Sequence, residues 1–169
     1  MLGTGGFAMT RASVALSTVL LAAAAAAAQV PPDFTGTWTL DESRSVSATQ
    51  DGFVGPVVWT IGQQERAITV AIARGPKHYT LTFPLLSKAP ASPPDQVPSS
   101  RAFWIEDRLV TELAQSIQGQ TVITREEWTL QPGGRELIVE RLVKVEHGYT
   151  MRGGRSYNTA KDTFVKAVR

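Results

Sequence analysis

Apolar and polar residues alternate with a period of two along much of the chain, which is typical of β-strands. The longest alternating stretch, residues 122–145, is interrupted by a Gln-Pro-Gly-Gly turn at 131–134. One register of the resulting hairpin satisfies all of its cross-strand pairs, and a one-residue slip would break them. The predicted pairs are Leu130 with Leu137, Trp128 with Val139, Glu126 with Arg141, Thr124 with Val143 and Val122 with Val145.

Shorter hairpins are predicted on both sides of this one. We expect Ile61 to pair with Ile68 and Ile72 to pair with Tyr79, which places apolar side chains on one face and threonines on the other. The further predicted strands are 36–40, 57–61, 68–72, 79–83, 101–106, 108–113 and 162–168, with a short one at 149–151. A turn of helix is expected near residues 41–43, and 84–100 is a proline-rich connection.

Eight to ten short strands joined by successive hairpins predict an all-β, antiparallel up-and-down meander. A meander of this length tends to close into a barrel, and closure also removes the unpaired edge strands. A two-sheet β-sandwich is the alternative, because alternation alone does not distinguish the two. In either case residues 29–169 form a single domain.

Residues 1–28 are predicted to be a Sec-type signal peptide. Arg11 precedes an uncharged apolar run that ends in alanines, and cleavage is expected after Ala28. An uncleaved anchor is less favoured, because the run is short and built of Ala. The protein is therefore expected to be periplasmic or extracellular, with no stable membrane anchor after cleavage.

Composition narrows the possible partners. The chain has 169 residues, no cysteine, and seventeen Lys and Arg against fifteen Asp and Glu. Without cysteine it forms no disulfide, thiolate metal site or lipoprotein anchor. The near balance of charge gives no support for nucleic-acid binding. The sequence leaves the oligomeric state open.

The start of the mature chain, Asp33-Phe34-Thr35-Gly36-Thr37-Trp38, resembles the Gly-x-Trp signature of lipocalins. The whole mature chain resembles small secreted bacterial proteins that are described as lipocalin-like. The resemblance implies a calycin-type barrel in which Gly36 and Trp38 are structural. It also implies that Trp38 packs against a basic residue from the last strand, for which the candidates are Arg152, Arg155 and Arg169. Lipocalins carry a helix near the C-terminus, and none is predicted here.

Glu126 and Arg141 are the most informative pair of charged residues, since the predicted register points both toward the apolar side. Arg141 would grip the carboxylate of a fatty-acid-like ligand while Glu126 orients it. The alternative, which we favour, is a structural ion pair near the barrel mouth. Arg101 and Glu112 form a second predicted cross-strand pair, for which a structural role is favoured more strongly.

Large aromatic residues are predicted to face the core or lumen, where they would line a cavity or fill it. They are Trp59, Tyr79, Phe83, Trp104 and Trp128. His78 and His147 have no partners at metal-ligand spacing, so neither a metal site nor a histidine-based triad is expected. No phosphate-binding or nucleophile motif is present, and no cofactor is predicted.

The first functional hypothesis is an exported, non-catalytic barrel that binds a small apolar or amphipathic ligand in its lumen. Its mouth would lie near the loops 41–56 and 84–100, with Arg141 as the polar anchor. The alternative is a structural or interaction protein of the cell envelope, with a filled barrel and functional loops. An enzyme is the least supported reading.

Overall fold

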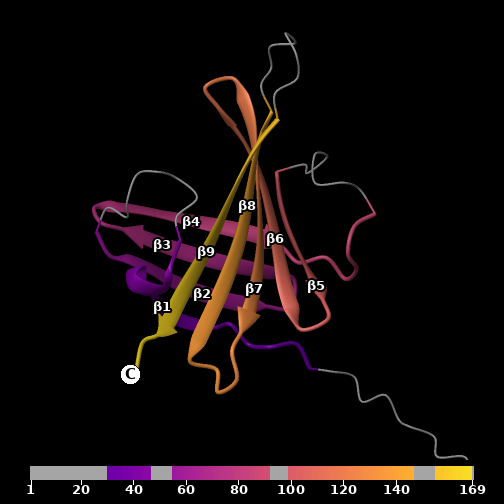
Figure 1. The fold of residues 1–169 in the computed structure, drawn as a ribbon. Helices are drawn as coiled ribbons and strands as arrows, with labels where there is room; N and C mark the ends of the chain where they lie inside the picture. The colour runs from indigo at the N-terminus through magenta and orange to yellow at the C-terminus, as the bar shows by residue number, and fades with distance from the viewer. Residues whose placement is uncertain (1–29, 47–54, 92–98, 147–154, 169) are drawn as a thin grey trace, which may run out of the picture.

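The computed structural model describes residues 30–46, 55–91, 99–146 and 155–168. Nine strands form one continuous sheet that wraps around a common core (Figure 1). They are β1 (Gly36–Leu40), β2 (Val57–Gln64), β3 (Ala67–Arg74), β4 (Lys77–Pro84), β5 (Ser100–Ile105), β6 (Arg108–Ile117), β7 (Gln120–Leu130), β8 (Glu136–Glu146) and β9 (Arg155–Lys166). A single 3-10 turn, η1 (Glu42–Arg44), follows β1, as the sequence predicted.

The strand order confirms the predicted up-and-down barrel. Neighbours in the sheet follow the order β4-β3-β2-β1-β9-β8-β7-β6-β5, so β1 lies between β2 and the last strand. A ring with an odd number of strands cannot be antiparallel at every junction. The exception is the seam between β4 and β5, where Leu85 forms one parallel bridge with Ala102. The barrel is therefore closed everywhere except at a weakly paired seam.

The register of the central hairpin is confirmed, including Glu126 opposite Arg141 and Trp128 opposite Val139. The pairing of Tyr79 with Ile72 is also confirmed. So is the pairing of Arg101 with Glu112, which is part of the β5–β6 hairpin.

The predicted pairing of Ile61 with Ile68 is wrong, because Ile61 pairs with Val70 instead. The two-residue turn Glu65–Arg66 connects β2 to β3 and shifts the register by two positions. A shift of two keeps every side chain on its original face, so the alternating pattern does not distinguish the two registers. The turn length decides between them.

The last strand begins at Arg155, earlier than the predicted start at Asp162. Polar residues in its first half hide it from a hydrophobicity pattern, although β9 pairs with β8 from Arg155 to Val165. The short strand predicted at 149–151 lies outside the described residues.

Aromatic rings fill one end of the barrel. The ring centroid of Trp59 lies 5.3 Å from that of Trp128 and 4.4 Å from that of Phe164. Phe34 closes the end, with its ring 5.9 Å from Trp128, and its carbonyl accepts a hydrogen bond of 2.8 Å from Trp38 Nε1. This part of the lumen is packed with side chains rather than open.

The basic residue at Trp38 is Lys166, which was not among the residues expected from the sequence. Lys166 is the direct β9 partner of Trp38, and its Nζ lies 5.0 Å from the centre of the indole ring. Of the predicted candidates, Arg155 lies at the opposite end of β9, while Arg152 and Arg169 are outside the described residues. Trp38 thus packs against a basic residue of the last strand, as predicted, but that residue is Lys166 and not Arg155.

Gly36 makes room for this lysine. Its φ is +140°, and a Cβ at this position would lie 2.7 Å from Lys166 Cε. We expect Gly36→Ala to lower the free energy of unfolding by about 1–3 kcal/mol through backbone strain. Chemical denaturation measures the loss. Gly62→Ala in β2 is the matched control, because a Cβ there meets nothing within 4 Å. Equal effects of the two substitutions would contradict the role assigned to Gly36.

Candidate functional site

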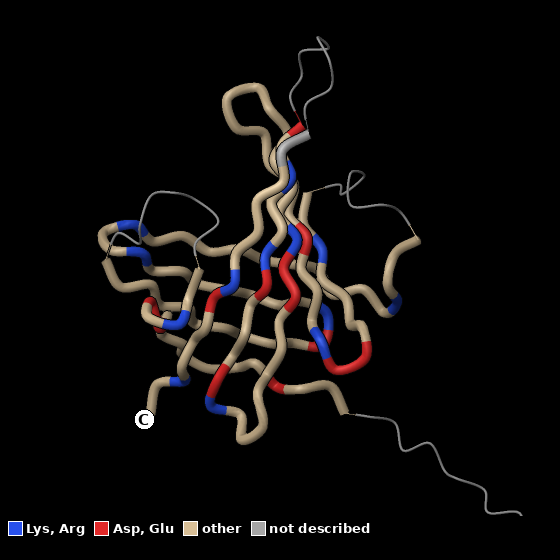
Figure 2. The backbone as a smooth tube through the Cα atoms, viewed as in Figure 1, with Lys and Arg blue, Asp and Glu red and all other residues tan. Residues whose placement is uncertain are grey.

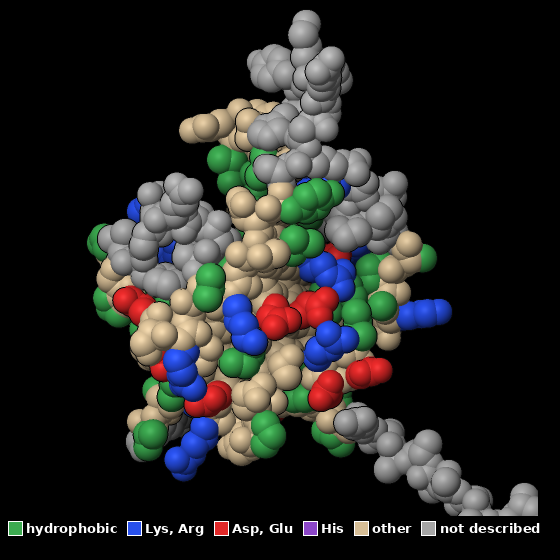
Figure 3. Space-filling model, viewed as in Figure 1, with side chains coloured by type: hydrophobic (Ala, Val, Ile, Leu, Met, Phe, Trp, Pro, Cys, Tyr) green, Lys and Arg blue, Asp and Glu red, His purple; other side chains and the backbone are tan. Residues whose placement is uncertain are grey.

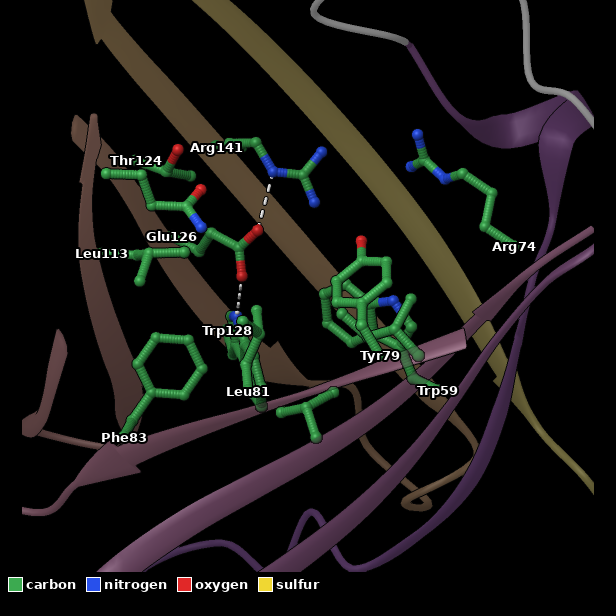
Figure 4. A pocket seen from close by; sticks show the side chains of 13 residues that line it. Trp59, Arg74, Tyr79, Leu81, Phe83, Leu113, Thr124, Glu126, Trp128 and Arg141 are labelled. Atoms are coloured by element: carbon green, nitrogen blue, oxygen red, sulfur yellow. Dashed lines mark hydrogen bonds and ion pairs between the residues drawn. The ribbon is translucent and has the colours of Figure 1, made fainter. Parts of the chain in front are cut away.

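A cavity of about 220 Å³ remains in the barrel beyond the aromatic end (Figure 4). Strands β2, β3 and β4 form one wall, and β6, β7 and β8 form the other. Trp59 and Trp128 belong to both the packed core and the cavity wall. The lumen is therefore partly filled and partly open, which neither reading of the sequence anticipated.

Six of the seven predicted site residues line this cavity: Trp59, Tyr79, Phe83, Glu126, Trp128 and Arg141. Tyr79 is 47% exposed and stands at the rim, whereas Trp59, Phe83 and Trp128 are buried. Trp104 does not line the cavity. Its ring stacks on Phe34, with 6.0 Å between centroids, at the aromatic end of the barrel.

The cavity lies beside the weakly paired seam of the barrel. β5 begins at Ser100, opposite Leu113, whereas β6 continues to Ile117. Among the described residues, no strand separates this last part of β6 from β4. Leu81 of β4 and Leu113 of β6 both line the cavity. The short β5 thus explains why space is left on this side of the lumen.

The polar wall consists of Arg141 and Glu126, which line the cavity, and of Asp162, which contacts Arg141 but does not line the cavity. Arg141 Nε lies 2.7 Å from Glu126 Oε1, and Arg141 Nη1 lies 2.9 Å from Asp162 Oδ2. Glu126 Oε2 also accepts a 3.0 Å hydrogen bond from Trp128 Nε1. All three charged groups are largely shielded, with 17% of the Arg141, 13% of the Glu126 and 4% of the Asp162 side chain exposed. The predicted ion pair is thus part of a triad that includes a second acid.

Asp162 was absent from the predicted site, because the weak apolar pattern of the last strand does not define its register. Leu137 pairs with Phe164 and Val139 pairs with Asp162, so Asp162 lies diagonally opposite Arg141. Matching the apolar Phe164 to Leu137 would have been the signal that places this acid in the cluster.

Burial raises the pKa of Asp162 above its ordinary value of 3.8, and the nearby Arg141 only partly offsets this effect. Arg141 is shared with Glu126, so one guanidinium faces two carboxylates. Asp162 Oδ1 is buried and has no hydrogen-bond partner among the described residues. Burial acts to lower the pKa of Arg141, but the charges of Glu126 and Asp162 outweigh it and raise that pKa.

The outer face carries a second, separate charge network. The predicted pair Arg101–Glu112 is present, with 2.6 Å between Nε and Oε2. Arg125 joins Glu112 to Glu127, at 2.8 and 3.2 Å, and Arg108 completes the chain at 2.7 Å from Glu127. Figure 2 shows these alternating charges on neighbouring strands of one side of the barrel, and Figure 3 shows charged side chains gathered on the surface there. This network ties β5, β6 and β7 together, away from the cavity.

No group of three His, Cys, Asp or Glu side chains suited to a metal ion occurs in the described ranges. His78 is exposed on β4, and His147 lies outside those ranges. Within the same residues, no helix is long and apolar enough to span a membrane.

No protein-family model matches the chain, and no curated protein matches its sequence. Solved structures with a similar outline include the fluorescent protein UnaG, at 19% identity and a TM-score of 0.45 over 79% of this chain and 97% of that one. Human cRBP IV matches at 18% identity and a TM-score of 0.41, over 81% and 100% of the two chains. A heat-soluble (SAHS) protein from Ramazzottius varieornatus matches at 13% identity and 0.41, over 79% and 95%. The barrel assignment rests on this chain's own strand order and register.

Removing Arg141 would leave two shielded carboxylates without their counter-charge. We expect Arg141→Met to lower the free energy of unfolding by about 3–5 kcal/mol, measured by chemical denaturation. Lys161→Met is the control, because Lys161 pairs with Glu140 at 3.5 Å with both side chains more than half exposed. That change should cost about 0–1 kcal/mol. A loss at Arg141 no larger than at Lys161 would contradict the structural role of the triad.

The raised pKa of Asp162 predicts a pH dependence of stability. Below pH 3.8 the carboxyl is protonated in both the folded and the unfolded chain. As the pH rises, the unfolded chain releases this proton first, so the folded state loses stability until the pH passes the raised pKa. The free energy of unfolding of the wild type, relative to Asp162→Asn, should therefore fall as the pH rises above 3.8.

Denaturant titrations across a pH series measure this difference. Asp107→Asn, at the exposed β5–β6 turn, controls for the loss of one carboxylate. A wild type that gains stability over Asp162→Asn with rising pH would overturn the assignment.

Proposed function

We propose that this protein is an exported, non-catalytic carrier that holds a small amphipathic molecule in the open part of its lumen. The observation that carries the proposal is the cavity of about 220 Å³, with aromatic and aliphatic walls and a few polar groups. Concave, mostly apolar sites with a small number of placed polar groups are typical of small-molecule binding. Export rests on the sequence of residues 1–28, which lie outside the described residues.

The size of the cavity favours a compact ligand. An engineered cavity of about 150 Å³ in another protein accommodates benzene, whereas drug-sized ligands occupy pockets of roughly 300–1,000 Å³. A space of about 220 Å³ suits a molecule of one or two rings, or a short chain. This argues against the long acyl chain of a fatty acid as the ligand.

The polar wall favours binding over catalysis. Both oxygens of Glu126 are occupied, one by Arg141 and one by Trp128. Arg141 in turn contacts two carboxylates. Groups held in this way stabilise the wall and orient a ligand but are not poised to transfer protons. Arg141 is accordingly assigned to the wall rather than to the grip on a ligand.

Native mass spectrometry of the protein, gently purified from its secretion host, tests both parts of the proposal. We expect a chain that begins at Gln29 and carries a co-purified compound of one- or two-ring size. Thr124→Phe, which projects a larger side chain into the cavity, should abolish the adduct because the space is then filled. Thr82→Phe, the same substitution on the exposed outer face of β4, should leave it unchanged.

An unoccupied chain that also binds no neutral aromatic probe, such as 2-naphthamide, would overturn the carrier function. That result would favour a structural or interaction protein of the cell envelope. An exported chain that retains residues 1–28 would overturn the cleaved signal peptide.

A further inference from the structure

We propose that the ligand carries a single oxyanion group, such as a carboxylate, and that Arg74 at the rim of the cavity recognises it. This inference rests on the proposed carrier function and identifies the chemical class of its ligand. It also moves the anchor from Arg141, which the sequence suggested, to a residue that the sequence marked only as part of a turn.

Arg74 is the last residue of β3 and lines the cavity at its exposed edge. In Figure 4 its guanidinium lies across the opening from that of Arg141, and the hydroxyl of Tyr79 points up between the two. These side chains come from three different strands, β3, β4 and β8. The rim thus brings the exposed guanidinium of Arg74 and the hydroxyl of Tyr79 to a single opening.

The two arginines differ in how their charge is compensated. Arg141 is held by Glu126 and Asp162, so the polar wall has no spare positive charge. Arg74 forms no ion pair with any described residue, although its charge acts on the Asp162 carboxylate from beyond contact distance. The charged residues that line the cavity are Arg74, Glu126 and Arg141. Arg74 is therefore the cation at the cavity that no described carboxylate contacts directly.

An anion fits this rim better than it fits the polar wall. A guanidinium donates two parallel hydrogen bonds to a carboxylate, and the Tyr79 hydroxyl is able to donate a third. An oxyanion placed against Arg141 would instead meet the neighbouring carboxylates of Glu126 and Asp162, and like charges repel. The apolar body of such a ligand would lie between Trp59 and Phe83, which are both buried in the wall.

Isothermal titration of two matched probes tests the inference. 2-Naphthoate carries the anion, and 2-naphthamide is its neutral counterpart with the same ring system. We expect the wild type to bind naphthoate more tightly, and Arg74→Gln to weaken naphthoate binding at least about tenfold, since hydrogen bonds to charged groups contribute strongly. Naphthamide binding should change less than about twofold, because the neutral probe makes no charge-assisted bond.

Lys77→Gln is the matched control. Lys77 pairs directly with Arg74 across the β3–β4 turn and is exposed, but it does not line the cavity. The Lys77→Gln substitution removes one positive charge from the same turn. If Arg74 contacts the carboxylate directly, this substitution should weaken naphthoate binding less than about twofold. Thermal unfolding of both variants checks that the fold is retained.

The outcomes separate the inference from the function on which it rests. Equal losses in Arg74→Gln and Lys77→Gln would overturn the inference, since diffuse charge would then account for the effect. A wild type that binds naphthamide as tightly as naphthoate would also overturn the inference. That result would leave the proposed carrier function unaffected. A wild type that binds neither probe would overturn both.

Discussion

The constraint on which this structure depends is the closure of an odd number of strands into a ring. Eight of the nine junctions around the barrel are extended antiparallel pairings, so the ninth must join parallel neighbours. That junction, between β4 and β5, holds a single bridge from Leu85 to Ala102. Because the strands part there, the wall of the lumen is incomplete on one side, and the cavity lies against that side. Topology, rather than any single side chain, sets where the lumen stays open.

Packing and charge then divide the interior into two halves. Aromatic rings around Trp59 and Trp128 fill one end and leave no space for a ligand. In the other half, Arg141 is shared by two acids, which hold its guanidinium in the polar wall. The barrel is thus filled with side chains at one end and contains an open cavity at the other.

The sequence predicted most where several constraints coincide. The β7–β8 hairpin combines apolar pairs, an opposed acid and base and a defined turn, so only one register fits. The β2–β3 register failed because two positions of slip leave the apolar face unchanged. Asp162 and Arg74 were missed for a different reason. Asp162 reaches the site through the register of β9 against β8, and Arg74 reaches it from the end of β3. Both residues are charged, so a hydrophobic pattern does not place them.

The position of β1 between β2 and β9 affects how the protein is made. Trp38 pairs with Lys166, so the ring lacks its closing strand until β9 has been synthesised. Until then β1 has a free edge, and the hairpins already formed belong to an open sheet. Open edges invite pairing with other chains. A truncated product that lacks β9 would therefore keep an unpaired edge on β1.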